Sequence, residues 1–427
     1  SRLTRQAMML GAATMALALT LAGCSSSGGS DGQVEIDTSQ DYDVAEVQAI
    51  VDLAFGTEVP IDELPAEAVT GFARATIELT DEQVQTALDC WKQPECTIGD
   101  GPLHVGIYNA VDNLWQTAAV MDVILQALTY PEIGKISYSF VADLPSAQSA
   151  VRSLAADGAD IIIGYNAFGS AMAPVFTEAQ AAGAVVVTYT GETPDVDGGV
   201  INNQVYALAC DAGTGMADVT VDDLGLTSSD DIAFFFGTPG NPQDTLVEGC
   251  LADQLVALDG PQIGFEQDTD WSRPGVAAAA TALIASGVPA KAVLNTYADP
   301  VPQLISAYDQ AGVQVPAILT WTEMNELFGI WEERVGTDAE FPLYYTNALV
   351  NQARLALTNA VGIIAGDDIP DRTPLPLPII KAEMDINGTD IKTLVDRYKA
   401  LKGSTGEARE AMELANVVMA AIGALTN

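Results

Sequence analysis

The stretch from residue 147 to residue 192 decides the fold: AQSAVRSLAADGADIIIGYNAFGSAMAPVFTEAQAAGAVVVTYTGE. It holds two short apolar runs, residues 159–163 and 184–189, and each follows a segment with helical periodicity, residues 147–156 and 171–182. The runs are rich in Val and Ile and do not alternate with polar residues, which is typical of strands buried on both faces of a parallel sheet. The stretch therefore predicts a helix–strand–helix–strand unit of an α/β protein.

The same pattern extends in both directions along the chain and indicates repeated βα units. About nine strands are more than one sheet of this kind usually holds. We therefore predict two doubly wound, Rossmann-like lobes, with the ligand cleft at the carboxyl ends of their strands. The other predicted strands are residues 103–108, 135–141, 231–236, 262–265, 292–296, 317–321 and 342–345, and the other predicted helices are residues 114–129, 244–258 and 276–286.

The first 23 residues have the pattern of a secretory signal. Arg2 and Arg5 precede an uncharged apolar run, residues 7–22, which is shorter than the ~20 apolar residues of a membrane span. The run ends in Leu-Ala-Gly-Cys24, and the Ser/Gly-rich stretch after it is typical of a flexible tether. The tetrapeptide resembles the bacterial lipobox, which implies that Cys24 is acylated and anchors an exported protein to a membrane. An ordinary transmembrane helix is the alternative.

The other four cysteines agree with export, because an even number in an oxidising compartment indicates two disulfides. Cys90 and Cys96 flank a short proline-containing turn that could bring them together. Cys210 and Cys250 would then pair, although the sequence does not fix the connectivity. A zinc site would need Cys-x-x-Cys spacing or histidine partners, and His104 is the single histidine. We predict no metal and no cofactor.

The net charge limits the partners. The chain has 427 residues, of which 58 are acidic and 17 basic, for a net charge of −41. Such a chain would be repelled by the phosphates of nucleic acid and by anionic lipid. The hydrophobic share of 48% argues against disorder. Acidic residues spread over nearly every predicted helix indicate a solvated surface. They argue against a strongly anionic ligand, unless Arg273 beside Trp271 points into the cleft.

Both ends of the α/β region differ from it in pattern. Acidic segments with apolar residues at helical spacing precede it, and Thr80 with Gln83 fits a capping box at the start of one of them. After the region, residues 389–427 predict two more helices, separated at residues 402–404. The predicted helices of the N-terminal extension are residues 44–55, 63–76 and 80–91.

Residues 100–385 resemble the type I periplasmic binding proteins, of the ribose and galactose kind that serve sugar ABC importers. The resemblance is carried by the strand and loop HVGIYNAVDNLW at 104–115, the stretch quoted above, and three further segments at 232–249, 268–275 and 295–312. It implies a type I periplasmic-binding-protein fold, in which two lobes close on a small molecule by hinge motion. The chain of such proteins crosses between the lobes three times, which suggests crossings near Asn202, Asn347 and Lys381. The implied division is a signal peptide at 1–23, a tether at 24–40, a helical extension at 41–100, lobe 1 at 101–201 and 347–381, lobe 2 at 202–346, and a C-terminal helical segment at 382–427.

The resemblance also implies the function. It predicts an extracytoplasmic, lipid-anchored, monomeric receptor that binds a sugar or related polar metabolite and delivers it to an ABC permease. The alternative is a ligand-sensing subunit that docks on a signalling receptor. An enzyme is not predicted, because the chain lacks a P-loop, a complete dinucleotide fingerprint and a nucleophile elbow.

Candidate ligand-binding residues follow the predicted strands. Trp115 and Trp271 come from loops of opposite lobes and would present indole walls to the C–H faces of a sugar, or would cage a cationic or apolar ligand. The polar candidates could instead be turn or cap residues, and the tryptophans could be core residues. The full set is Asn109, Asp112, Asn113, Trp115, Asn166, Glu192, Trp271, Asp299, Trp321 and Asn347.

Three positions depart from the family pattern. Leu246 stands where sugar-binding members carry an arginine, and Asn166 and Trp321 stand where an aspartate is usual. The site therefore lacks three charged groups of typical pentose and hexose binders.

Overall fold

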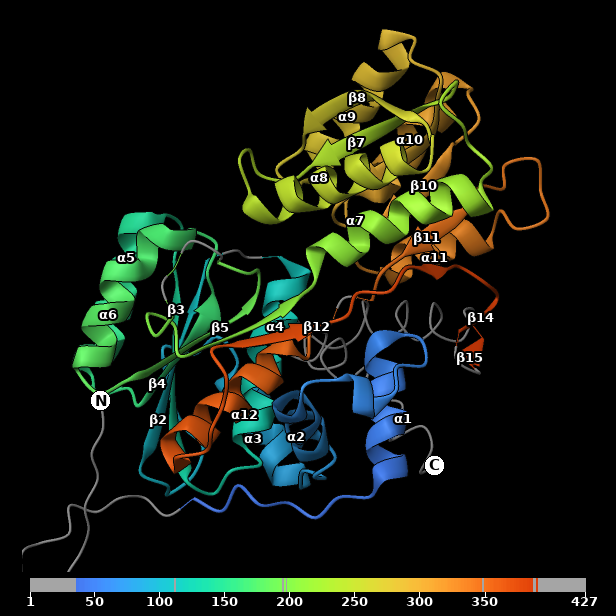
Figure 1. Ribbon diagram of the computed structural model, residues 1–427. Helices are drawn as coiled ribbons and strands as arrows, with labels where there is room; N and C mark the ends of the chain where they lie inside the picture. Colours follow the sequence, from blue (N-terminus) through green and yellow to red (C-terminus); the bar gives the residue numbers. More distant parts are fainter. Residues whose placement is uncertain are drawn as a thin grey trace, which may run out of the picture. The chain divides into compact units, whose positions relative to one another are not determined.

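The predicted strands form two separate parallel-dominated sheets in the computed structural model (Figure 1). The structure describes residues 36–110, 113–193, 196, 198–347, 349–386 and 389–390. The α/β class predicted from the apolar runs is confirmed. The signal peptide, Cys24, Asp112 and the helices expected within residues 391–427 lie outside the described residues.

The first sheet is built around the quoted stretch. Its strands are β1 (Glu95–Thr97), β2 (Leu103–Asn109), β3 (Ile133–Phe140), β4 (Ile161–Tyr165), β5 (Val185–Thr190), β6 (Asn203–Ala207) and β12 (Arg372–Leu375). Their order is β1-β3-β2-β4-β5-β6-β12, and all pairs are parallel except β1 with β3. Every residue of β2 and β4 is buried, as expected of strands covered on both faces.

Two helical layers cover this sheet. Helices α5 (Leu144–Ala156) and α6 (Ala173–Ala181) pack together on one face, and the turn η2 (Gly169–Met172) precedes α6. Helices α4 (Leu114–Ala127) and α12 (Gln352–Ala365) cover the other face (Figure 1). Phe176 and Val151 belong to the core under α5 and α6.

The second sheet repeats the pattern. Its strands are β7 (Asp231–Phe236), β8 (Gln262–Asp268), β9 (Ala290–Asn295), β10 (Ala317–Thr320), β11 (Leu343–Tyr345) and β13 (Ile380–Lys381), in the order β13-β11-β10-β9-β7-β8. Helices α9 (Arg273–Ser286), α10 (Val301–Ala311) and α11 (Asn325–Glu332) share one core with β7, β9, β10 and β11. Helix α8 (Pro242–Ala257) packs against α7 (Ala209–Asp218), which continues into the short π-helix η3 (Val219–Asp223).

Within the described residues the chain passes between the two sheets after β6, before β12 and before β13, and the first of these changes comes later than the crossing predicted near Asn202. Strand β6 pairs with β5, so the chain stays in the first sheet through Ala207 and does not leave it near Asn202. The last change falls before Ile380, because β13 pairs with β11 of the second sheet. Strand β6 was missed because its sequence, NQVYA, carries too few apolar residues to stand out.

The N-terminal extension is part of the first lobe's helical layer. It comprises α1 (Val44–Phe55), η1 (Ile61–Glu63), α2 (Ala66–Ala75) and α3 (Asp81–Cys90), and the predicted capping box of Thr80 and Gln83 is present. The second helix starts at Ala66 and not at residue 63, because Pro65 occupies the N-cap. A β-carbon on Gly71 would lie 2.4 Å from Leu355 Cδ2, so α2 and α12 pack closely.

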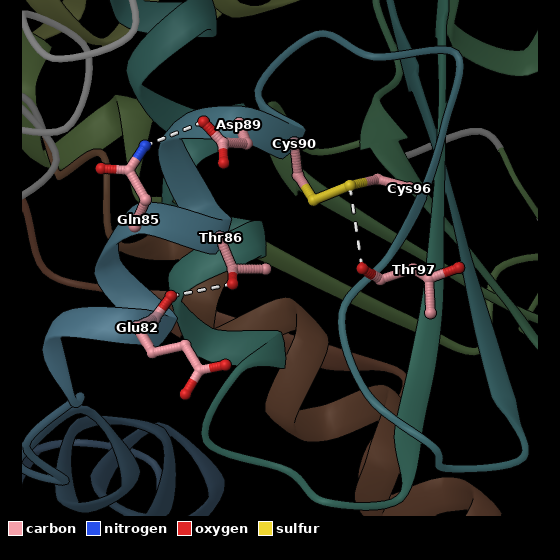
Figure 2. Close-up of a disulfide and its surroundings, with 7 residues drawn as sticks. All are labelled: Glu82, Gln85, Thr86, Asp89, Cys90, Cys96 and Thr97. Atoms are coloured by element: carbon pink, nitrogen blue, oxygen red, sulfur yellow. Dashed lines mark hydrogen bonds between the residues drawn. A yellow bond between two sulfur atoms is a disulfide. The ribbon is translucent and has the colours of Figure 1, made fainter.

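The disulfides are those expected. Cys90–Cys96 joins the end of α3 to β1 (Figure 2), and Cys210–Cys250 joins α7 to α8. Strand β1 extends the first sheet, so the first of these bonds ties the extension to that sheet.

The C-terminal segment departs from its prediction where it is described. Thr389–Asp390 form β15, which pairs with β14 (Asp385–Ile386) and is not helical. The Asn387-Gly388 pair between them is a common hairpin signal. Among the described residues, no helix is long and apolar enough to cross a membrane.

A buried ion pair joins α4 and α12, the two helices that cover the same face of the first sheet. Arg354 of α12 donates through Nε to Oδ1 of Asp122 on α4, and their side chains are 3% and 0% exposed. Burial raises the pKa of Asp122 to about 6, although the Arg354 charge opposes the shift. Removing one partner from such a pair leaves an uncompensated buried charge.

We expect Arg354→Met to lower the free energy of unfolding by about 3 kcal/mol at neutral pH. The loss should be smaller near pH 5, because an Asp122 with a raised pKa can then fold in its neutral form. Urea unfolding at the two pH values measures this. The double variant Asp122→Leu/Arg354→Met is the control and should lose less than the single variant, whereas equal losses would contradict an ion-pair role.

Candidate functional site

Two asparagine amides at the carboxyl ends of β2 and β4 are held by their nitrogens. Asn109 Nδ2 lies 3.4 Å from the Tyr138 hydroxyl, and Asn166 Nδ2 donates to Gly169 O at 3.0 Å and Thr193 Oγ1 at 2.9 Å. The Oδ1 atoms of both asparagines are buried and have no hydrogen-bond partner. Buried polar atoms are rarely left so. These two oxygens are therefore acceptors that a bound ligand could satisfy.

Asn113 and Trp115 begin α4, and the structure gives them different roles. Asn113 is the N-cap, and its side chain accepts the Gln116 N–H at 2.9 Å, which is a cap function. Trp115 is half-buried, with its ring centroid 6.1 Å from that of Tyr189 on β5. The hydroxyl of Tyr297, which follows β9, hydrogen-bonds to the Trp115 backbone. Trp115 thus lies where residues of both sheets meet.

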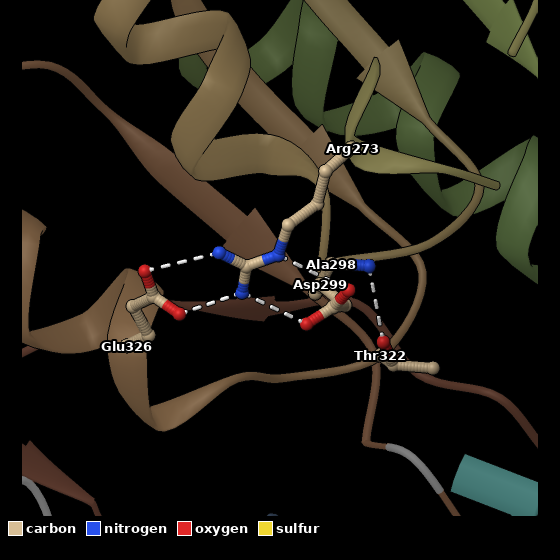
Figure 3. Close-up of polar contacts among 5 residues, drawn as sticks. All are labelled: Arg273, Ala298, Asp299, Thr322 and Glu326. Atoms are coloured by element: carbon tan, nitrogen blue, oxygen red, sulfur yellow. Dashed lines mark hydrogen bonds and ion pairs between the residues drawn. The ribbon is translucent and has the colours of Figure 1, made fainter. Parts of the chain in front are cut away.

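The two candidate carboxylates within the described residues, Glu192 and Asp299, are paired with arginines. Glu192 accepts from Arg372 Nη1. Asp299 Oδ1 lies 3.0 Å from Arg273 Nη2, which also lies 2.6 Å from Glu326 Oε2 (Figure 3). Glu326 and Asp299 raise the pKa of Arg273 further above its usual range. The pairs hold strand-end loops in place, and the arginine charges are compensated.

Trp271 is fixed in the loop between β8 and α9. Its Nε1–H donates to Thr296 Oγ1 at 2.9 Å. Its indole covers the backbone of Gly237 so closely that a β-carbon there would lie 1.8 Å from Cε2. Asp270 and Trp271 have φ values of 54° and 50°, a strained conformation for residues other than glycine. Such strain commonly marks functional positions.

The last two candidates follow β10 and β11. Trp321 is buried, with 6% of its surface exposed, and its backbone N–H donates to Asn295 O. Asn347 Oδ1 accepts the Leu349 N–H at 2.9 Å, so this amide forms a turn. The side chain of Asn347 also lies beside Gly56 at the end of α1.

Sequence reasoning missed several polar groups that surround these residues. Tyr165 at the end of β4 accepts a hydrogen bond from the side chain of Asn241, the N-cap of α8 in the second lobe. Burial raises the pKa of Tyr165, and of Tyr189 and Tyr297, so all three hydroxyls are neutral. Each tyrosine ends or closely follows a predicted strand, which was the available signal.

The sequence matches the periplasmic binding protein domain family over residues 105–335, more than half of the chain. The chain therefore belongs to this family. The family consists of extracytoplasmic solute-binding proteins, which places the chain among binding proteins and not among enzymes. A search of curated protein sequences found no match.

Solved structures with the same fold include several sugar-binding proteins. The binding component of an arabinose ABC transporter from Shewanella sp. ANA-3, bound to L-arabinofuranose, is 15% identical with a TM-score of 0.62, covering 71% of this chain and 99% of that one. A solute-binding protein of Bacillus halodurans C-125 with myo-inositol is 15% identical, with a TM-score of 0.60 and coverage of 70% and 100%. The fructose-binding periplasmic domain of a hybrid two-component system is 13% identical, with a TM-score of 0.58 and coverage of 75% and 99%. At these identities the likeness establishes the type I fold.

We expect Gly237→Ala to displace the Trp271 indole, because the added methyl group would overlap the ring. The displaced indole should become more exposed, which shifts tryptophan emission to longer wavelength and increases quenching by acrylamide. Gly249→Ala on α8 is the matched control, since no atom lies within 4 Å of its added β-carbon. An unchanged emission spectrum in Gly237→Ala would show that the ring is not held on this backbone.

Proposed function

We propose that this protein is a lipid-anchored receptor that binds a neutral sugar or polyol outside the cytoplasm and delivers it to an ABC importer. Family membership supports the binding role, and the similar structures that hold arabinofuranose and myo-inositol support the ligand class. The observation that carries the proposal is the pair of buried, unpartnered amide oxygens of Asn109 and Asn166.

Ligand hydroxyls suit these oxygens. A buried acceptor without a partner costs free energy, and a hydroxyl donor from the ligand removes that cost. A sugar also has C–H faces, which the Trp271 indole could cover. The Tyr189 hydroxyl is also buried without a hydrogen-bond partner and offers both a donor and an acceptor.

The charges near the candidates favour a neutral ligand over an anion. Arg273 and Arg372 are the arginines in contact with candidate residues, and carboxylates compensate both. An anionic ligand would therefore have to break an existing ion pair. A neutral polyol needs only hydrogen-bond partners and an apolar wall.

Calorimetric titration with L-arabinose, D-fructose and myo-inositol, and with glutamate and betaine as charged comparisons, tests the ligand class. We expect binding of at least one of the polyols and of neither charged compound. Mass spectrometry of small molecules released from the denatured protein extends the search. Tight binding of glutamate alone would contradict the proposal.

For the polyol that binds, we expect Trp271→Ala to weaken affinity about tenfold, since the variant loses aromatic contact area over the ring. Trp331→Phe serves as control, because Trp331 packs in the core of the second lobe and its indole donates to Phe341 O. The calorimeter measures both dissociation constants. Equal affinities in Trp271→Ala and the parent protein would show that the indole does not contribute to ligand binding.

The lipid anchor is tested separately. We expect Cys24→Ala to move the protein from the membrane fraction to the soluble extracytoplasmic fraction, because the acylated thiol is lost. Immunoblots of the two fractions measure the change. Unchanged membrane retention in the variant would argue against acylation at this residue.

A sensing role is the second candidate, favoured by the likeness to a periplasmic domain of a two-component system. Cross-linking in cells followed by mass spectrometry separates the two. An ABC permease among the cross-linked partners supports delivery to an importer, and a receptor kinase supports sensing.

A further inference from the structure

Asp244 occupies an unusual place for an aspartate in the first turn of a helix. Such a residue commonly stays in water near the helix N-terminus, and here Asn241 already caps α8. Asp244 instead turns inward and is 1% exposed. Its Oδ2 accepts the backbone N–H of Gly237 at 2.5 Å. The role of this buried carboxylate therefore depends on the groups that it contacts.

The carboxylate of Asp244 lies behind the two groups that fix Trp271. One is the backbone of Gly237, on which the indole rests. The other is the hydroxyl of Thr296, which accepts the indole N–H and lies close enough to Asp244 to lower the pKa of its carboxyl. This second contact is looser than an ordinary hydrogen bond, because Asp244 Oδ1 has no hydrogen-bond partner.

The strained turn before Trp271 is tied to the same strand end. Thr269 donates to Phe236 O through both its N–H, at 2.9 Å, and its hydroxyl, at 2.6 Å. The Asp270 N–H donates to Gly237 O at 2.9 Å. The end of β7 therefore carries both the turn and the ring, and Asp244 holds that end through the N–H of Gly237.

We propose that Asp244 is a positioning residue for the ligand-binding site, which fixes the Trp271 indole through the backbone of Gly237 and the hydroxyl of Thr296. The part that concerns the ligand rests on the proposed function. The part that concerns the ring is independent of any ligand.

The direction of the hydrogen bonds makes the ionised carboxylate the better support. The Thr296 hydroxyl has one proton, and when it donates this proton to the carboxylate its oxygen is free to accept from the indole. A neutral Asp244 can itself donate to the Thr296 oxygen, where it competes with the indole N–H. Protonation of Asp244 should therefore loosen Trp271.

The pH range follows from the surroundings of Asp244. Burial raises the pKa of Asp244 to about 6, the Gly237 N–H and the Thr296 hydroxyl oppose the shift, and the Asp268 charge on β8 adds to it. Tyr165 on β4 also lies within electrostatic range. Because this pKa is raised above 3.8, ionisation costs folding stability as pH rises from about 4 to 6. Over the same range the ring should become better held.

The Trp271 indole N–H gives a readout that needs no ligand. In heteronuclear NMR of the isotope-labelled protein, Trp271→Phe assigns the signal. We expect its chemical shift to titrate with a midpoint near pH 6, and to be independent of pH in Asp244→Asn. Asp268→Asn is the matched control and should keep the titration with a lower midpoint, because a neighbouring charge is removed. A titration that persists in Asp244→Asn overturns the proposal.

Ligand affinity supplies the second readout, with the polyol among L-arabinose, D-fructose and myo-inositol that binds. We expect its dissociation constant to rise at least threefold between pH 7.5 and pH 5, and to be weak at both pH values in Asp244→Asn. If Asp244→Asn does not fold, Thr296→Val and Thr296→Ser replace it, and only Thr296→Ser should keep the parent's titration and affinity. An affinity independent of pH overturns the role in binding. If none of the polyols binds while the indole titrates as expected, the proposed function fails and the positioning of the ring stands.

Discussion

The burial of parallel strands on both faces is the constraint on which the rest of the structure depends. Every residue of strand β4, with the sequence IIIGY, is buried, because α5 and α6 cover one face of its sheet and α4 and α12 the other. Side chains in the middle of such strands can only pack. Polar groups with a binding role are therefore confined to the ends of the strands, where the helices leave room.

This confinement explains the mixture of satisfied and unsatisfied polar groups at the strand ends. Asn109 and Asn166 are anchored through their amide nitrogens and keep a buried carbonyl oxygen without a partner. Glu192 and Asp299 are neutralised by arginines. The ion pairs fix the positions of the loops, and the unpartnered amide oxygens determine which ligand groups the loops can bind. Trp271 belongs to the fixed part, since its ring is held by contacts that exist without a ligand.

The accuracy of the sequence predictions follows the strength of the local signal. Strand β7 and helix α1 were predicted to the residue, because their apolar patterns and caps are continuous in the sequence. Strand β6 was missed, since its position in the sheet depends on the neighbouring β5 and not on its own composition. Thr389 was assigned to a helix, whereas the structure places it in a strand that pairs antiparallel with Asp385–Ile386.

The sequence by itself determined the class of the fold, the presence of two lobes, and the loops in which candidate residues lie. The connectivity of the four cysteines was fixed only by the structure. Periodicity and spacing are local properties, and a single chain displays them. Only the tertiary structure decided which candidate side chains have all their polar atoms paired and which keep an unpartnered polar atom. Arg273 meets both Asp299 and Glu326 from distant elements, and Asp244 turns inward under Trp271. Such contacts join residues far apart in sequence, and no periodicity records them.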